Sequence, residues 1–153
     1  MPDKQAPEKE AIAFEGVNPI LRVDNLEASI DYYTRVLGFH VNWRTTFIAS
    51  VKRGRCDLFL SQDDQGHAGA WVWIGVGDVE TLFAEYIANG AKVRHSPTNY
   101  PWACEMQIED LDGNVLRMDS DSKEGQPFGE WLDMYGDRWI SSPTGEPVKL
   151  ERV

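Results

Sequence analysis

Residues 70–93 read AWVWIGVGDVETLFAEYIANGAKV, and this stretch decides the fold. Its first part is an apolar run that suits a strand, and from Val79 onward apolar residues recur at helical spacing. Asp78 stands in front of the helix as an N-cap, and Gly90 follows it as a C-terminal stop. The stretch therefore predicts a strand that leads through a short turn into a helix.

Residues 17–39, VNPILRVDNLEASIDYYTRVLGF, repeat this order of signals. Aligning Val23 with Val76 gives an offset of 53 residues (76 − 23), and the same offset brings the N-cap Asn25 onto Asp78. Strands, caps and helices that match at one fixed offset indicate an internal repeat. The chain is therefore predicted to contain two copies of one module.

Three short strands are predicted after each helix, because strand-like runs there are separated by turn signals. The expected strands cover residues 40–46, 47–53 and 56–62 in the first copy, and 91–97, 103–110 and 114–120 in the second. Each module is then β-α-β-β-β, and two modules make an α+β fold with mostly antiparallel strands. We place the modules at residues 14–62 and 69–121, after a flexible arm at 1–13 and before an aromatic-rich extension at 122–153.

The composition and the N-terminus limit the classes of function. The chain of 153 residues carries 25 acidic against 15 basic residues and a formal net charge of −10, which argues against binding to a nucleic-acid backbone. The N-terminal MPDKQAPEKE lacks the apolar core of a signal peptide, and no apolar run approaches the ~18 residues of a membrane span. We therefore expect a cytoplasmic protein without nucleic-acid or membrane partners. Cys56 and Cys104 have no CxxC spacing, so disulfides and structural zinc are not predicted.

Strand parity places two tryptophans on the face of the second sheet opposite its helix. Residues i and i+2 of a strand point the same way, and Val72, Ile74 and Val76 are the aliphatic set suited to packing beneath the helix. Trp71 and Trp73 then point to the concave side, either as packing residues inside a barrel or as the wall of a ligand cleft. The other concave positions are Asn18, Ile20 and Arg22 in the first strand and Val115, Arg117 and Asp119 in the last.

The two-module pattern, with RVDNLEASIDYYTRVLGF at 22–39 and EDLDGNVLRMD at 109–119, resembles the vicinal oxygen chelate superfamily, which includes glyoxalase I, extradiol dioxygenases and bleomycin resistance proteins. The resemblance covers residues 16 to 121. Within it, DLFLS, AWVWIGVGDVETLFAEY and YPWACEMQIEDLDGN are most similar to bleomycin resistance proteins, which bind a cationic drug in grooves shared by two subunits. It implies a curved, partly open mixed β-barrel with the helices outside, and a homodimer.

Enzymes of this superfamily hold a divalent metal with His, Gln or Glu side chains. Carried over position by position, three of the usual ligand sites fall on Asn18, Trp71 and Arg117. A guanidinium cannot coordinate a cation and repels one. His40, His67 and His95 do not match the family's ligand positions either. We therefore expect no metal and no cofactor, although the acids Asp57 and Glu105 keep a relocated metal site open.

The resemblance to bleomycin resistance proteins implies an aromatic ligand site. Phe47 and Trp102 fall where these proteins place ring-stacking residues, and Trp71 and Trp73 would line the same cleft. Flat heteroaromatic rings stack on indoles, and cations are attracted to indole faces. By the same resemblance, Ser61 is expected to form a hydrogen bond to the ligand.

Two features leave the identity of the ligand open. Arg117 either contacts an anionic group of the ligand or pairs with a concave acid such as Glu105 or Asp119. The segment 125–139, GQPFGEWLDMYGDRW, lies beyond the resemblance. It is expected to do one of three things: to cover the ligand groove, to narrow it or to extend it. Its large apolar side chains, expected to pack against the barrel or the partner subunit, are Phe128, Trp131, Leu132, Tyr135 and Trp139.

The lead hypothesis is a non-catalytic protein that sequesters an aromatic, cationic antibiotic, as the resemblance implies. The acidic composition would attract such a ligand. The alternative is a metal-dependent enzyme of the glyoxalase or dioxygenase type, with its metal at a relocated site. A third hypothesis is a binding subunit or immunity factor for another natural product, which the C-terminal extension would favour.

Overall fold

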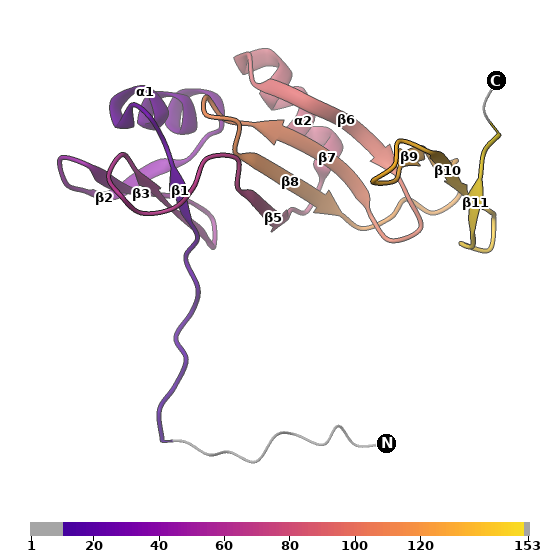
Figure 1. The fold of residues 1–153 in the computed structure, drawn as a ribbon, viewed down its shortest axis with the longest axis horizontal. Helices are drawn as coiled ribbons and strands as arrows, with labels where there is room; N and C mark the ends of the chain where they lie inside the picture. Colours follow the sequence, from indigo (N-terminus) through magenta and orange to yellow (C-terminus); the bar gives the residue numbers. More distant parts are fainter. Residues whose placement is uncertain (1–10, 152–153) are drawn as a thin grey trace.

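The computed structural model describes residues 11–151. Figure 1 shows the first module, the second module and a small C-terminal sheet in a row along the longest axis. None of the helices in this range is long and apolar enough to cross a membrane. The elements follow in the order β1 (Ile20–Arg22), α1 (Leu26–Asp31), η1 (Tyr32–Val36), β2 (His40–Arg44), β3 (Ile48–Arg53), β4 (Cys56–Ser61), β5 (Trp71–Gly75), α2 (Val79–Asn89), β6 (Lys92–Asn99), β7 (Cys104–Glu109), β8 (Val115–Ser120), β9 (Glu130–Leu132), β10 (Arg138–Ser141) and β11 (Pro147–Lys149).

Each module folds into a four-stranded mixed sheet with the same strand order. The order is β1-β4-β3-β2 in the first module and β5-β8-β7-β6 in the second. In both sheets the first strand pairs in parallel with the last, whereas the other pairs are antiparallel. The predicted α+β fold of two β-α-β-β-β modules is confirmed.

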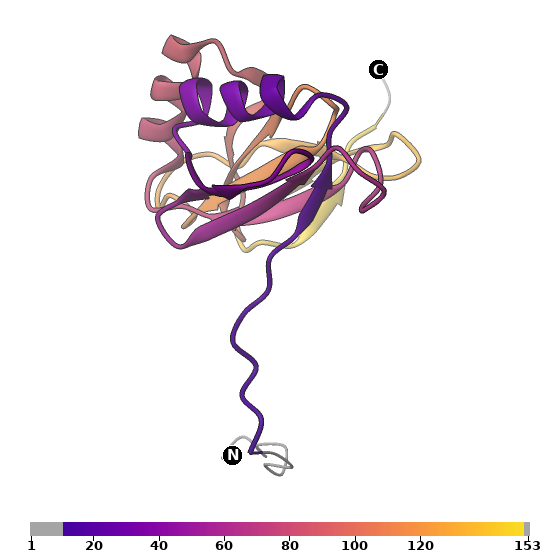
Figure 2. The same ribbon diagram turned by 90° about the vertical axis from the view of Figure 1, so that its left-hand side faces the viewer.

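The two sheets do not close into a barrel within the chain. Across residues 11–151, strands of the first sheet pair with none of the second, and β1 and β5 are edge strands. Closure would require strand pairing between the modules, but they join through side chains of a common core instead. Figure 2 shows both helices on the same side of the sheets, so neither helix covers the opposite sheet faces.

The predicted caps set the starts of both helices. The side chain of Asn25 accepts a hydrogen bond from the Ala28 amide at 3.0 Å. Asp78 caps α2 by accepting from the Thr81 amide at 3.1 Å. Gly90 ends α2 with φ +79°, a left-handed conformation that glycine adopts without steric cost. Local sequence therefore sets the residue at which each helix begins and the residue at which α2 ends.

The first helix differs from the single α-helix that its periodicity predicts, because α1 continues as the π-helix η1. The amide of Leu37 donates to the carbonyl of Tyr32 at 3.1 Å, which closes the wider turn. Both Tyr32 and Tyr33 thereby point inward. Their hydroxyls donate to the Glu109 carbonyl at 2.6 Å and to Asp110 Oδ2 at 2.9 Å, and so tie the first helix to the second module.

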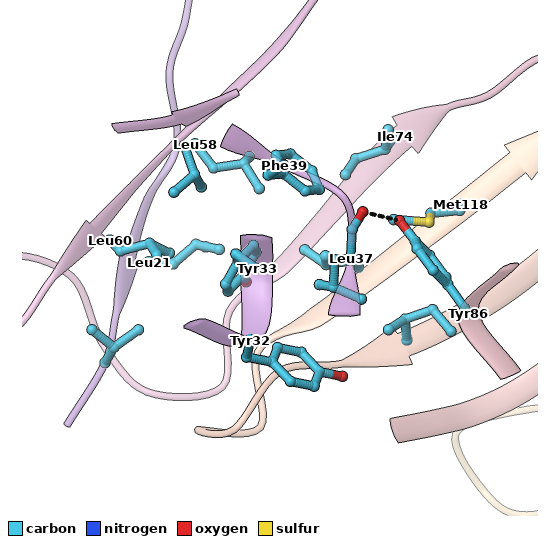
Figure 3. Close-up of a cluster of buried hydrophobic side chains, with 14 of the residues drawn as sticks. Leu21, Tyr32, Tyr33, Leu37, Phe39, Leu58, Leu60, Ile74, Tyr86 and Met118 are labelled. Atoms are coloured by element: carbon cyan, nitrogen blue, oxygen red, sulfur yellow. Dashed lines mark hydrogen bonds between the residues drawn. The ribbon is translucent and has the colours of Figure 1, made fainter. Parts of the chain in front are cut away.

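One hydrophobic core runs through both modules, as Figure 3 shows. Leu37 and Phe39 follow the first helix and pack with Ile74 and Met118 from the second sheet. The hydroxyl of Tyr86 donates to the carbonyl of Leu37 at 3.1 Å (Figure 3). Burial raises the pKa of Tyr86 to about 12. The core therefore fixes the second sheet relative to the first.

The C-terminal extension forms an antiparallel sheet of β9, β10 and β11, which the sequence did not predict. The Gly129 amide joins it to the second module by donating to the Asn99 carbonyl at 2.8 Å. Trp131 packs inward, whereas Tyr135 stays 78% exposed and Leu132 is also exposed. Of the predicted N-terminal arm, residues 1–10 lie outside the described range.

Candidate ligand-binding groove

A groove of about 960 Å³ lies between the second sheet and the C-terminal sheet. It lies on the sheet face that points away from α2, as strand parity predicts for the concave side. Strands β5 to β8 supply one wall and strands β9 and β10 the other. The lining residues are Trp71, Arg94, His95, Tyr100, Trp102, Glu105, Gln107, Arg117, Glu130, Trp131, Leu132 and Arg138.

Three aromatic rings form one corner of the groove. Trp102 lies parallel to Tyr100, with ring centroids 4.7 Å apart and planes 5° apart. Trp131 from β9 meets Trp102 edge to face, with centroids 5.3 Å apart at 83°. Because Tyr100 is buried and Trp102 is 51% exposed, the buried ring supports the exposed one. The corner therefore presents aromatic surface that is held in place before any ligand arrives.

Trp71 supplies aromatic surface on the sheet wall. The guanidinium carbon of Arg94 lies 4.8 Å from the centroid of the Trp71 ring, within the range of a cation–π contact. Nη1 of Arg94 also donates to Oε1 of Gln107 at 2.6 Å. These contacts hold the Arg94 side chain against the sheet, although both Trp71 and Arg94 remain exposed.

Arg117 stands on the floor of the groove between two carboxylates. Its Nε lies 3.0 Å from Oε1 of Glu105 in an ion pair, and its Nη2 donates to Oδ2 of Asp119 at 3.1 Å. The pairing follows from register, since Gln107 stands opposite Arg117 on β7 and Glu105 stands opposite Asp119. Both acids are buried. Arg117 pairs with concave acids, which is one of its two expected roles, and its contact with a ligand group stays a prediction.

Trp73 completes this cluster from the edge strand. It stands opposite Arg117 in the β5–β8 register, and its Nε1 donates to Oδ2 of Asp119 at 2.9 Å. Asp119 thus accepts two hydrogen bonds on one oxygen. Its other oxygen, Oδ1, is buried and has no hydrogen-bond partner within the described chain.

A second ion pair holds the rim. Arg138 on β10 donates through Nη2 to Oε1 of Glu130 on β9 at 2.8 Å. The hydroxyl of Tyr100 donates to the backbone carbonyl of Glu130 at 3.3 Å, which links the C-terminal sheet to the groove wall. Burial raises the pKa of the Tyr100 hydroxyl above its ordinary value.

The predicted site residues separate into two groups. Trp71, Trp102 and Arg117 line the groove together, and Trp73 is joined to Arg117 through Asp119. Phe47 and Ser61 lie in the first module instead. Phe47 is exposed at the bend before β3, whereas the Ser61 hydroxyl is fully buried and without a hydrogen-bond partner in residues 11–151.

Sequence reasoning missed several groove residues. Arg94 lies on β6, whose pairing with β7 shifts register between Val93 and His95, and Tyr100 directly follows this strand. Simple alternation along the strand therefore does not identify these two residues. The sequence predicted that Trp131 packs against the barrel or the partner subunit, but it did not identify Tyr100 and Trp102 as the residues that Trp131 contacts. Arg138 carried no signal, because its place depends on how the C-terminal sheet docks.

Two of the three residues at the family's metal positions, Trp71 and Arg117, do not fit a metal. The indole of Trp71 offers no lone pair to a cation, and the Arg117 guanidinium is itself a cation held by Glu105 and Asp119. Among residues 11–151 there is also no cluster of three or more His, Cys, Asp or Glu side chains arranged to hold a metal ion. We derive no chemical step through a metal.

Comparison with solved structures finds proteins that share this fold. TnmS3, an antibiotic binding protein from Streptomyces sp. CB03234, has 22% sequence identity and a TM-score of 0.62, and the match covers 72% of this chain and 99% of that one. TioX from Micromonospora sp. ML1 has 21% identity and a TM-score of 0.60, covering 69% of this chain and 98% of that one. A glyoxalase/bleomycin resistance protein/dioxygenase from Nocardioides has 18% identity and a TM-score of 0.59, with 77% and 91% covered.

These likenesses show the fold, and the family follows from the sequence. A comparison with curated proteins finds no match. A family model does match residues 16–118, which is most of the chain. The chain belongs to the glyoxalase/bleomycin resistance protein/dioxygenase superfamily.

Proposed function

We propose that this protein binds an aromatic, cationic small molecule of the antibiotic type in the groove and sequesters it without transforming it. A protein of this kind lowers the free concentration of the ligand, so protection depends on affinity and on the amount of protein. We place this activity in the cytoplasm. TnmS3, which shares the fold, is described as antibiotic binding and makes this class of ligand a reasonable one to test.

The observation that carries the proposal is the aromatic corner of Tyr100, Trp102 and Trp131. The stacked pair of Tyr100 and Trp102 leaves Trp102 half exposed toward the groove, and Trp71 stands on the sheet wall of the same groove. A flat ring of the ligand can stack on such a surface, because aromatic rings prefer offset-stacked or edge-to-face contacts.

The charged groups of the groove suit binding more than catalysis. Arg117 is held by Glu105, and Arg138 by Glu130. Arg94 lies over Trp71 and donates to Gln107. Side chains held in such pairs orient a ligand, whereas an acid–base catalyst needs a group that is poised to exchange a proton with the substrate.

We further propose that the protein is a homodimer in which the open face of the first module of one copy lies against the second module of the other. Trp43 and Phe47 are exposed large side chains on the first module, and Trp71 and Trp73 are exposed on the second. Surfaces of this kind mark interaction sites. Phe47 would then approach the groove of the partner copy. A sedimentation mass of one chain at micromolar concentration would contradict the dimer.

The experiment that tests the proposal combines metal analysis with a fluorescence titration. The metal content of the purified protein is measured first, and metal-free bleomycin is then titrated while the tryptophan emission is followed. Saturable quenching at about one ligand per chain, with chemically unchanged drug recovered afterwards, supports sequestration.

The same experiment addresses the alternative of a metal-dependent enzyme. A tightly retained, stoichiometric metal together with no response to the drug would overturn the sequestration proposal and direct attention to a relocated metal site. Other natural products with flat aromatic rings then serve as a screen for the third hypothesis, a binding subunit or immunity factor.

A further inference from the structure

A second, smaller hollow of about 420 Å³ adjoins the groove. Trp102 and Arg117 line both spaces, so a ligand that lies on Trp102 reaches either one. The hollow is otherwise lined by Trp73, Gly75, Val76, Gly77, Ala103, Asp119, Ser120 and Asp121. Its composition differs from that of the groove in the sign of its charge.

The charge of the hollow is acidic. One guanidinium, that of Arg117, and two carboxylates, those of Asp119 and the exposed Asp121, line the hollow. Glu105, which also pairs with Arg117, lines the larger groove. The larger groove instead holds the guanidinium groups of Arg94 and Arg138 as well. An anionic group is therefore disfavoured in the hollow, and a cationic group is attracted to it.

Asp119 carries an unused acceptor. The residue is only 6% exposed, and its Oδ2 accepts from Trp73 Nε1 at 2.9 Å and from Arg117 Nη2 at 3.1 Å. Its Oδ1 has no hydrogen-bond partner anywhere in residues 11–151. A buried carboxylate oxygen without a donor is costly, so each such atom in a native fold requires an explanation.

The walls of the hollow are suited to a cation. The Trp73 side chain is 63% exposed, and its ring lies so close to Gly75 that a Cβ added there would stand 3.0 Å from it. Trp102 supplies a second indole, which is half exposed. The faces of indole rings attract cations, and they do so more strongly when the cation is partly desolvated.

We propose that this hollow is the subsite for a protonated amine of the ligand. The ammonium group lies against the indoles of Trp73 and Trp102 beside the carboxylates of Asp119 and Asp121, while the aromatic part of the ligand occupies the groove. This inference rests on the proposed function and adds the ligand class, a flat ring that carries an alkylammonium group. A divalent metal fits less well, because it needs several oxygen ligands and the Arg117 guanidinium would repel it.

The test compares two probes that share the ring and linker and differ only in the terminal group, an ammonium or a neutral hydroxyl. These are 2-(1-naphthyl)ethylamine, which is protonated at neutral pH, and the neutral 2-(1-naphthyl)ethanol, each titrated into the full-length protein and followed by NMR shifts of the indole N–H signals. The ammonium probe is expected to bind about tenfold more tightly than the alcohol, because hydrogen bonds to charged groups are the stronger ones.

Variants locate the effect. Asp119→Asn is expected to bring the two affinities to near parity by weakening only the amine, and Asp121→Asn, at an exposed position, reduces the preference several-fold without the risk of misfolding. Glu124→Gln is the matched control, since Glu124 is an exposed acid that does not line the hollow. Its preference for the amine is expected to equal that of the unaltered protein.

Failure of this inference is distinct from failure of the proposed function. An amine that binds no more tightly than the alcohol, or a preference that survives both Asp119→Asn and Asp121→Asn, overturns the amine subsite. If bleomycin still quenches the tryptophan emission in that case, the groove remains a binding site. If neither bleomycin nor either probe binds, the proposed function and the subsite both fail.

Discussion

Trp102 lies face to face on Tyr100, with the two ring planes only 5° apart. The ring of Tyr100 is fixed, because its hydroxyl donates to the Glu130 carbonyl and lies 3.1 Å from Nε2 of His95. The ring of Trp102 is half exposed and lines the groove. The structure therefore combines a rigid support with an accessible stacking surface, an arrangement that reduces the entropy lost when a ligand binds.

We expect Trp102→Ala to weaken bleomycin binding by about tenfold or more, because it removes the most accessible ring of the corner. The free energy of unfolding should change little, since the side chain is half exposed. Isothermal titration and thermal unfolding measure the two effects. Tyr135→Ala is the control, because Tyr135 is an exposed aromatic residue that does not line the groove. Equal affinities for the two variants would argue against the corner as the binding surface.

Trp131→Ala should loosen the C-terminal sheet from the second module. Trp131 contacts both Tyr100 and Trp102, with centroids 6.4 Å and 5.3 Å away. Because the side chain is half-buried, we expect a loss of about 1–2 kcal/mol, less than the ~3–5 kcal/mol of a fully buried tryptophan. Hydrogen exchange at the amides of β10 should accelerate. Val148→Ala on β11 is the control, and the same acceleration there would mean that the sheet is only marginally stable by itself.

Local patterns were sufficient to predict the two modules. The offset that aligns Val23 with Val76 reports a real repeat, and strand alternation correctly put Ile74 and Met118 in the core and Trp71 on the open face. These features depend on residues close in sequence and on the alternation of strand side chains. They are the part of a fold that a single sequence encodes most directly.

The C-terminal wall of the groove was beyond prediction for a physical reason. Strands β9 to β11 are short, and their register depends on pairing such as Trp139 with Trp131 and on docking through Gly129. Ser61 is a second example of a feature that could not be predicted from the sequence. The family resemblance implies that Ser61 contacts the ligand, but its complete burial results from neighbouring elements that the resemblance does not describe.

Glu85→Gln should lower stability at neutral pH but not in acid. Arg53 donates to both carboxylate oxygens of Glu85, at 2.7 and 3.1 Å, and this hydrogen bonding lowers the pKa of Glu85 from its ordinary 4.5. A lowered folded-state pKa means that the contribution is present above pH 4.5 and is lost as the pH falls through the lower, folded value. Because the pair is partly exposed, we expect about 0.5 kcal/mol.

The measurement for this pair is urea unfolding of both proteins across the acidic range. The two free energies of unfolding should differ at neutral pH and converge in acid. Glu27→Gln serves as a comparison, because the Glu27 carboxylate pairs with Arg44 within the first module and not across the modules. A difference between the unaltered protein and Glu85→Gln that grows toward low pH would contradict the assigned sign.

Gly75→Ala should displace Trp73 from Asp119. A Cβ at residue 75 would stand 3.0 Å from the Trp73 ring, closer than normal packing allows, whereas the Gly75 backbone itself imposes no left-handed conformation. The ring must therefore shift by a few tenths of an ångström, which is expected to weaken the 2.9 Å hydrogen bond from its Nε1 to Oδ2 of Asp119. We expect the indole N–H signal of Trp73 to shift in NMR spectra and the loss of stability to be about 1 kcal/mol.

Gly77→Ala is the matched control two residues away, because a Cβ there meets no atom within 4 Å. If both variants leave the Trp73 signal unchanged, the indole is not held by Asp119 in solution, and Trp73 does not form a fixed wall of the amine subsite.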